Sequence, residues 1–148
     1  MATKRLNTTL EAEGAEFLVL GHLLMVGIPA YKSYTRTVGH DLMAVNPSTN
    51  KSARIEVKSR WASDAHWNMG MKPAGAADYY IYVRLNRGNR YKVAPIRCKA
   101  PQYFVMPAKV PESLPKTGWG QARLKHLPDL DTYEDRWDLV RDFLEIPE

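Results

Sequence analysis

Hydrophobic and polar residues recur with two different periods along the chain, and the period predicts which segments are helical and which are extended. Residues 9–26 carry apolar side chains at helical spacing, next to Thr8 and Glu11, which have the spacing of an N-terminal capping box. We therefore predict a helix over 9–26. Glu13 and Glu16, three residues apart, make one edge of this helix acidic. The predicted packing stripe consists of Leu10, Ala15, Leu18, Val19, His22, Leu23 and Val26.

Strand character is clearest in two pairs of segments. Residues 41–46 and 53–60 flank a cluster of turn residues, which predicts an antiparallel hairpin. Residues 79–85 and 91–96 are rich in aromatic or β-branched side chains and flank a second turn at 86–89, which predicts another hairpin.

The remaining segments have weaker patterns. A short extended segment is expected over 30–35, and residues 102–106 can form a last strand. Residues 61–77 are predicted to be irregular or partly helical, and the prolines and glycines of 107–120 predict an exposed loop. Helical periodicity returns at Trp137 and continues through Ile146, which predicts a terminal helix.

These elements predict one α/β domain over residues 1–148. Its centre is a mixed β-sheet built on the hairpin at 41–60, with the first helix on one side and the terminal helix nearby. A chain of 148 residues, 45% of them hydrophobic, is long enough to bury a genuine core.

Charge and cysteine content narrow the class of protein. The chain has 21 Lys and Arg against 16 Asp and Glu, and a net charge of +5 favours a polyanionic partner. Cys98 is the single cysteine, which excludes an internal disulfide and a cysteine-rich zinc site and fits a reducing compartment. The apolar run 17–28 is too short to span a bilayer. A cytoplasmic protein with no membrane partner is therefore expected.

The first hairpin predicts a cluster of charged side chains. If its turn is centred between Ser48 and Thr49, residues whose numbers sum to 97 face each other, which places Asp41 opposite Glu56. Directly opposed residues have β-carbons about 5 Å apart, so the two carboxylates converge. Lys58 shares their side of the sheet because side chains alternate along a strand. Two close carboxylates need an intervening cation or proton, and their oxygen ligands suit Mg²⁺ or Mn²⁺.

The order of these residues resembles the PD-(D/E)XK, or restriction-endonuclease-like, nucleases. The matching residues are Glu16 in the helix, His40-Asp41 at the first strand, and Glu56-Val57-Lys58 on the second. The resemblance covers roughly residues 10–85, and residues 103–107 are similar to a last strand of some members. His40 stands where the family name has Pro, and no clear helix carrying a further polar catalytic residue follows Glu-x-Lys.

The resemblance implies a role for each matching residue. Asp41, Glu56 and the carbonyl of Val57 would hold Mg²⁺, and Lys58 would contact the attacking water and the scissile phosphate. Glu16 would orient Lys58 or help to hold a second metal ion. The bland alternative for Asp41, Glu56 and Lys58 is a solvated sheet face with a surface salt bridge, and for Glu16 it is an ordinary exposed helix position.

Five further residues are candidates for binding nucleic acid through phosphate contacts or base stacking: Arg36, Arg60, Trp61, Arg84 and Arg87. The alternative is that the arginines are solubilising charges and that the tryptophan belongs to the core. The group is better supported than any single member.

The function expected from this pattern is Mg²⁺-dependent hydrolysis of phosphodiester bonds in DNA by an endonuclease, which can act as a homodimer or a monomer. Two other readings stay open: a non-catalytic nucleic-acid-binding or assembly module that keeps the nuclease fold, and a hydrolase of small phosphate esters. The choice between DNA and RNA, and between a specific site, a branched junction and an end, also stays open.

Overall fold

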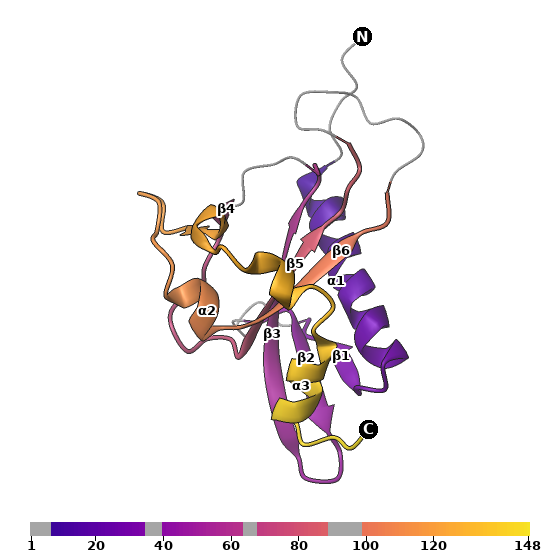
Figure 1. The fold of residues 1–148 in the computed structure, drawn as a ribbon. Coiled ribbons are helices and arrows are strands. Elements are labelled where there is room, and N and C mark those ends of the chain that lie inside the picture. The colour runs from indigo at the N-terminus through magenta and orange to yellow at the C-terminus, as the bar shows by residue number, and fades with distance from the viewer. Residues whose placement is uncertain (1–6, 35–39, 64–67, 89–98) are drawn as a thin grey trace.

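The computed structural model describes residues 7–34, 40–63, 68–88 and 99–148, and the statements below concern these ranges. Its centre is a five-stranded sheet with the strand order β1-β2-β3-β5-β6 (Figure 1). β3 runs parallel to β5, and the other neighbouring pairs are antiparallel. The predicted α/β class with a central mixed sheet is confirmed. The strands span Ala30–Lys32 (β1), Leu42–Asn46 (β2), Lys51–Arg60 (β3), Tyr79–Arg84 (β5) and Gln102–Pro107 (β6).

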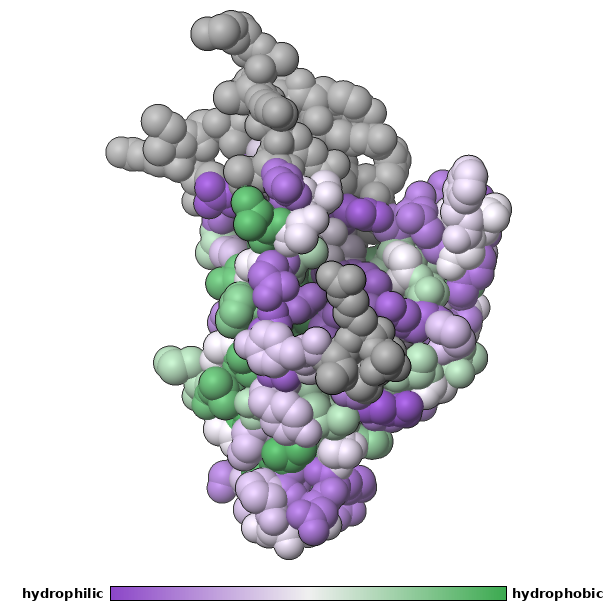
Figure 2. All heavy atoms as spheres, turned by 180° about the vertical axis from the view of Figure 1, so that it is seen from behind, coloured by the Kyte–Doolittle hydropathy of each residue, from purple (hydrophilic) through white to green (hydrophobic). Residues whose placement is uncertain are grey.

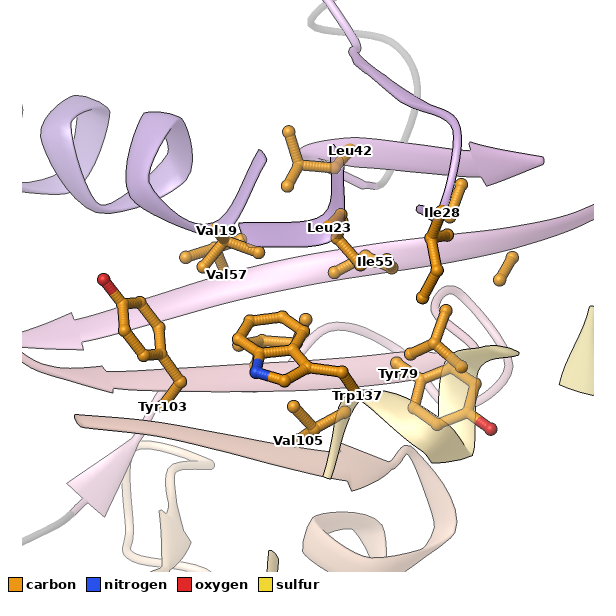
Figure 3. Packing of buried hydrophobic residues seen from close by; sticks show 14 of the residues in the cluster. Val19, Leu23, Ile28, Leu42, Ile55, Val57, Tyr79, Tyr103, Val105 and Trp137 are labelled. Carbon is orange, nitrogen blue, oxygen red and sulfur yellow. The ribbon is translucent and has the colours of Figure 1, made fainter. Parts of the chain in front are cut away.

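One face of the sheet is covered by two helices, α1 (Thr8–Met25) and α3 (Trp137–Phe143). Figure 3 shows side chains of both helices meeting those of β3 and β6. Alternate residues in the middle of β3, Ala53, Ile55 and Val57, point into this core. We call this the helical face.

The first helix agrees with its predicted range, but two details of the prediction are wrong. The N-cap is Asn7, whose Oδ1 accepts a hydrogen bond of 2.8 Å from the Thr9 amide, so Thr8 is the first helical residue and not the cap. Leu10 and Leu18, both placed in the packing stripe, are 68% and 38% exposed. His22 does pack, because its ring stacks on Trp137 at 5.4 Å with an interplanar angle of 3°.

The first hairpin has the predicted register. Leu42 lies opposite Ile55 and Ala44 opposite Ala53, and Asn50 in the turn takes a positive φ of 57°. In the second predicted hairpin, the returning strand 91–96 lies outside the described residues. The described neighbours of β5 are β3 and β6.

The opposite face of the sheet is covered by short elements, and we call it the irregular face. Its core includes Tyr80, Phe104 and Leu124. The predicted loop 107–120 is wrong in part, because it contains a four-residue helix. The covering elements are α2 (Lys109–Glu112), a small sheet of β4 (Asn68–Met69) and β7 (Ala122–Arg123), and 3₁₀ turns at Leu124–His126 and Leu130–Tyr133.

No helix in the described ranges is long and apolar enough to cross a membrane.

Candidate active site

Asp41 lies just before β2 and forms two hydrogen bonds with β3. Its amide donates to the carbonyl of Ile55 at 3.0 Å, and its Oδ2 accepts from the amide of Val57 at 2.8 Å. The strand ladder ends at Leu42, so the carboxylate oxygen takes the place of a strand carbonyl on Val57. These two hydrogen bonds hold Asp41 across β3 on either side of Glu56.

Glu56 points to the irregular face and is 2% exposed. Its Oε1 accepts from Lys58 Nζ at 2.8 Å, and Lys72 Nζ lies 3.9 Å from the same oxygen. Its Oε2 is buried and meets no hydrogen-bond donor in the described part of the chain. Burial raises the pKa of Glu56, the charge of Asp41 raises it further, and the lysines oppose the shift without cancelling it.

The structure therefore brings Asp41, Glu56 and Lys58 together at the centre of the sheet. Along the ladder, Glu56 lies beside Tyr80 and Lys58 beside Tyr82, and both tyrosines are almost fully buried. The charged row on β3 thus borders an aromatic row on β5. Because aromatic neighbours exclude water, electrostatic interactions in this row are stronger than they would be on an open surface.

Glu16 lies on the side of α1 that faces β1, where it forms an ion pair with Lys32 at 3.1 Å. Lys32 also pairs with Glu13, and its ammonium sits 4.2 Å from the centre of the Phe17 ring. Burial raises the pKa of Glu16, the hydrogen bond from Lys32 opposes the shift, and the charge of Asp41 adds to it. Among the described contacts, the ion pair of Glu16 is with Lys32 and not with Lys58. The predicted role of Glu16 toward Lys58 stays a prediction.

The chemistry of these residues fits a hard divalent cation. Glu56 Oε2 is a buried carboxylate oxygen without a donor, beside a second carboxylate, and this arrangement favours a cation. Within the described ranges, no three acidic, histidine or cysteine side chains gather closely enough to form a metal site alone. The candidate ligands are therefore the two carboxylates of Asp41 and Glu56, with the Val57 carbonyl as a backbone ligand.

The predicted nucleic-acid-binding residues fall into three places. Arg60 and Arg84 are ladder partners that extend the row of Glu56 and Lys58 along the same face. Arg60 donates to the carbonyl of Asn68, and Arg84 donates to Gln102 Oε1 at 3.1 Å.

Trp61 and Arg87 line one cavity of about 460 Å³ near the start of α1, together with Leu10, Leu85 and Lys99. The structure thus places these two residues together, beyond the ends of β3 and β5. Arg36 lies outside the described residues.

Sequence reasoning missed two lysines of this region. Lys32 pairs with both glutamates of the acidic edge of α1, and Lys72 faces Glu56 from the segment after β4. Lys72 belongs to the stretch 61–77, which has no hydrophobic period to place its side chains. The one sequence feature that points to Lys72 is that it is a basic residue close after Glu56-Val57-Lys58.

The comparison with solved structures agrees with this geometry. A bacterial homing endonuclease, I-Ssp6803I, superposes on 94% of this chain and 94% of its own chain, with a TM-score of 0.59 and 16% sequence identity. The chain has the restriction-endonuclease-like fold of the PD-(D/E)XK nucleases. The predicted resemblance to this group is thereby confirmed at the level of the fold, while the roles of Glu16, Asp41, Glu56 and Lys58 stay predictions. Neither a family model nor a curated protein sequence matches the chain.

Proposed function

We propose that this chain, acting as one nuclease domain over residues 1–148, is a metal-dependent endonuclease that hydrolyses phosphodiester bonds in DNA. The observation that carries the proposal is the buried carboxylate of Glu56, which has one oxygen without a donor, Lys58 on the other oxygen, and Asp41 across the same strand. Asp41, Glu56 and the carbonyl of Val57 are the proposed metal ligands, with Mg²⁺ or Mn²⁺ as the ion. The restriction-endonuclease-like fold supports this assignment.

The residues of the site divide the work of hydrolysis. When held by Asp41, Glu56 and the Val57 carbonyl, a divalent ion would lower the pKa of a bound water and neutralise negative charge that develops on the phosphate. Lys58 supplies an ammonium donor for the attacking water or for the developing negative charge. The hydrogen bond from Val57 fixes the carboxylate of Asp41, and the hydrogen bond from Lys58 fixes the buried carboxylate of Glu56.

Glu16 is the proposed fourth residue of the site. Its ion pair with Lys32 holds it at the edge of α1, within range of the charge of Asp41. We propose that it orients Lys58 or helps to hold a second metal ion.

DNA is the proposed substrate because the chain is basic, with a net charge of +5, and because Arg60 and Arg84 continue the catalytic row toward the ends of β3 and β5. Trp61 and Arg87 provide a stacking ring and a cation in the adjoining cavity.

The test is a cleavage assay on supercoiled plasmid, single strands and branched DNA with and without Mg²⁺. The wild type is compared with Asp41→Ala, Lys58→Ala and the control Lys51→Ala. Lys51 is the first residue of β3, away from the site, and pairs with Glu145. Metal-dependent cutting that both site variants abolish and the control retains is expected. Binding of DNA with no metal-dependent cutting of any substrate would instead favour a non-catalytic module.

A homodimer is part of the proposal because the outer face of α1 is apolar and open. Leu10, Phe17 and Leu24 recur every seven residues and are each at least half exposed, and Met25 is 86% exposed. Between them, Gly14 and Gly21 leave open space beside their α-carbons, which allows a second helix to come close. Hydrophobic residues gather along the α1 edge of the molecule in Figure 2.

A second copy of this chain is the proposed partner of that face. A row with a seven-residue repeat is complementary to itself about a two-fold axis. The helix has 18 residues and is about 27 Å long, which is enough for the three members of the row, and β1 is the edge strand of the sheet.

The mass in solution tests this part of the proposal. Leu24→Glu should convert a dimer into a monomer by light scattering, whereas Trp119→Glu, which alters an exposed apolar side chain in the loop after α2, should not. A wild type that is monomeric at tens of micromolar would rule out the dimer.

A further inference from the structure

Strand β4 and the residues that follow it are anchored to the central sheet at three points. The guanidinium of Arg60 donates to the carbonyl of Asn68, and the side chain of Met69, 1% exposed, is buried in the core of the irregular face. The amide of Lys72 donates to the hydroxyl of Tyr80 at 3.1 Å. Strand β4 and the three residues that follow it are held in this way, from Asn68 to Lys72.

The third anchor sets where Lys72 lies. Tyr80 is fully buried and is the ladder partner of Glu56, so a residue fixed to its hydroxyl is brought next to that carboxylate. The ammonium of Lys72 accordingly lies 3.9 Å from Glu56 Oε1, the oxygen that also accepts from Lys58 at 2.8 Å.

Charge balance shows what the second ammonium can do. One carboxylate oxygen faces two cations, and Lys58 holds it at the shorter distance. The ion pair at 3.9 Å with a lysine that is 43% exposed is weak, so Lys72 can exchange Glu56 for another anion at little cost. Asp41 and Glu56 balance Lys58 and Lys72, and a divalent ion would leave a charge of about +2 facing the dianionic transition state of phosphodiester hydrolysis.

We propose that Lys72 is a second catalytic lysine, which binds a non-bridging oxygen of the scissile phosphate while Lys58 serves the attacking water. The inference rests on the proposed nuclease function. It adds a contact to the substrate from the segment after β4, which contains none of Asp41, Glu56 and Lys58. Lys72 leaves Glu56 for the phosphate when DNA binds. No bond is made or broken by Lys72 itself.

The experiment compares three variants. Lys72→Met removes the charge and keeps a side chain of similar length. Lys72→Arg keeps the charge, and Lys51→Met is the matched control. Lys51 is 40% exposed and pairs with Glu145 at 3.4 Å, so it resembles Lys72 in exposure and in having one distant carboxylate. Thermal unfolding of each variant is recorded first.

Two readouts are measured on a substrate that the wild type cuts. Single-turnover cleavage at saturating protein should fall about 10²-fold in Lys72→Met, recover to within about tenfold in Lys72→Arg and stay unchanged in Lys51→Met. The salt dependence of DNA binding without metal should lose about one unit of slope in Lys72→Met alone, because one phosphate contact is lost.

The outcomes separate this inference from the proposed function. Cleavage by Lys72→Met within threefold of the wild type, with Lys58→Ala inactive, overturns the inference and leaves the function standing. A loss of activity that Lys72→Arg does not recover, together with a lowered melting temperature, shows a purely structural role and also overturns it. If the wild type cuts nothing, the proposed function fails, and an unchanged salt slope in Lys72→Met then overturns the phosphate contact as well.

Discussion

The two faces of the central sheet are both buried, yet they are covered in different ways. The helical face is closed by α1 and α3, whereas the irregular face is closed by a four-residue helix, two 3₁₀ turns and two strands of two residues each. The charged residues Glu56 and Lys58 point to the irregular face. Regular elements thus secure the sheet from one side, and the short elements of the other side surround the candidate chemistry.

The largest effect expected from this division is on catalysis. Glu56→Gln removes a charge from the irregular face without touching the helical face, so cleavage should fall by about 10³-fold or more while the fold persists. Single-turnover cleavage measures the rate, and circular dichroism shows whether the fold persists. Cleavage by Glu56→Gln at close to the wild-type rate would place the chemistry elsewhere.

Two leucines compare the faces directly in stability. Leu23 in α1 and Leu124 in a 3₁₀ turn are 0% and 1% exposed, and each belongs to the core of a different face. Leu23→Ala should cost about 3–5 kcal/mol and Leu124→Ala about 2 kcal/mol, because short elements collapse more easily around a cavity. The free energies of unfolding are measured by urea denaturation and are compared where the dependence on urea concentration is the same in both variants. Equal costs would show that the two covers are equally rigid.

Metal binding should stabilise the fold through the irregular face alone. At a Mg²⁺ concentration 100 times the dissociation constant, the wild type should gain about 2.7 kcal/mol, which raises the melting temperature by several degrees. Glu56→Gln should gain much less, because it lacks a ligand. Equal shifts in the wild type and Glu56→Gln would assign the ion to another site.

The smallest effect concerns an ion pair that ties β3 to the start of β5. Asp78 accepts hydrogen bonds from the amide and the guanidinium of Arg54, at 2.7 Å and 3.1 Å. Burial alone would raise the pKa of Asp78, but these bonds outweigh it and lower the pKa. A lowered pKa in the folded state means that the stabilisation is complete above the ordinary aspartate value of about 3.9 and is lost as the pH falls below it.

Asp78→Asn should therefore be less stable than the wild type by about 1 kcal/mol at neutral pH, and the difference should disappear in acid below about pH 3.9. Thermal unfolding from pH 7 to pH 2.5 measures it. A gap that widens in acid would contradict the assigned direction of the shift.

The predictable part of the molecule was the part with a hydrophobic period. The range of α1 and the register of the first hairpin followed from the sequence, because helical spacing and a turn cluster have strong local causes. The same register predicted that Asp41, Glu56 and Lys58 gather, and the structure confirms the register, while their catalytic roles stay predictions.

The rest depended on contacts between distant segments. Nothing local in residues 61–77 indicates that Tyr80 will hold the amide of Lys72, and nothing in α1 indicates that Lys32 will pair with Glu16. The cap of α1 was assigned to Thr8 from its spacing to Glu11, but Asn7 accepts the bond. Tertiary hydrogen bonds and ion pairs of this kind leave no periodic trace in a sequence.

The hydrogen bond from the Val57 amide to the Asp41 carboxylate has a practical consequence for trapping a complex with DNA. Alanine at position 41 would abolish an acceptor for the main chain of β3 together with the anionic charge, so the inactive protein could differ in shape from the active one. Asparagine keeps an oxygen at the end of the same short side chain and lacks only the charge. Asp41→Asn is therefore the variant of choice for crystallising an uncut DNA complex.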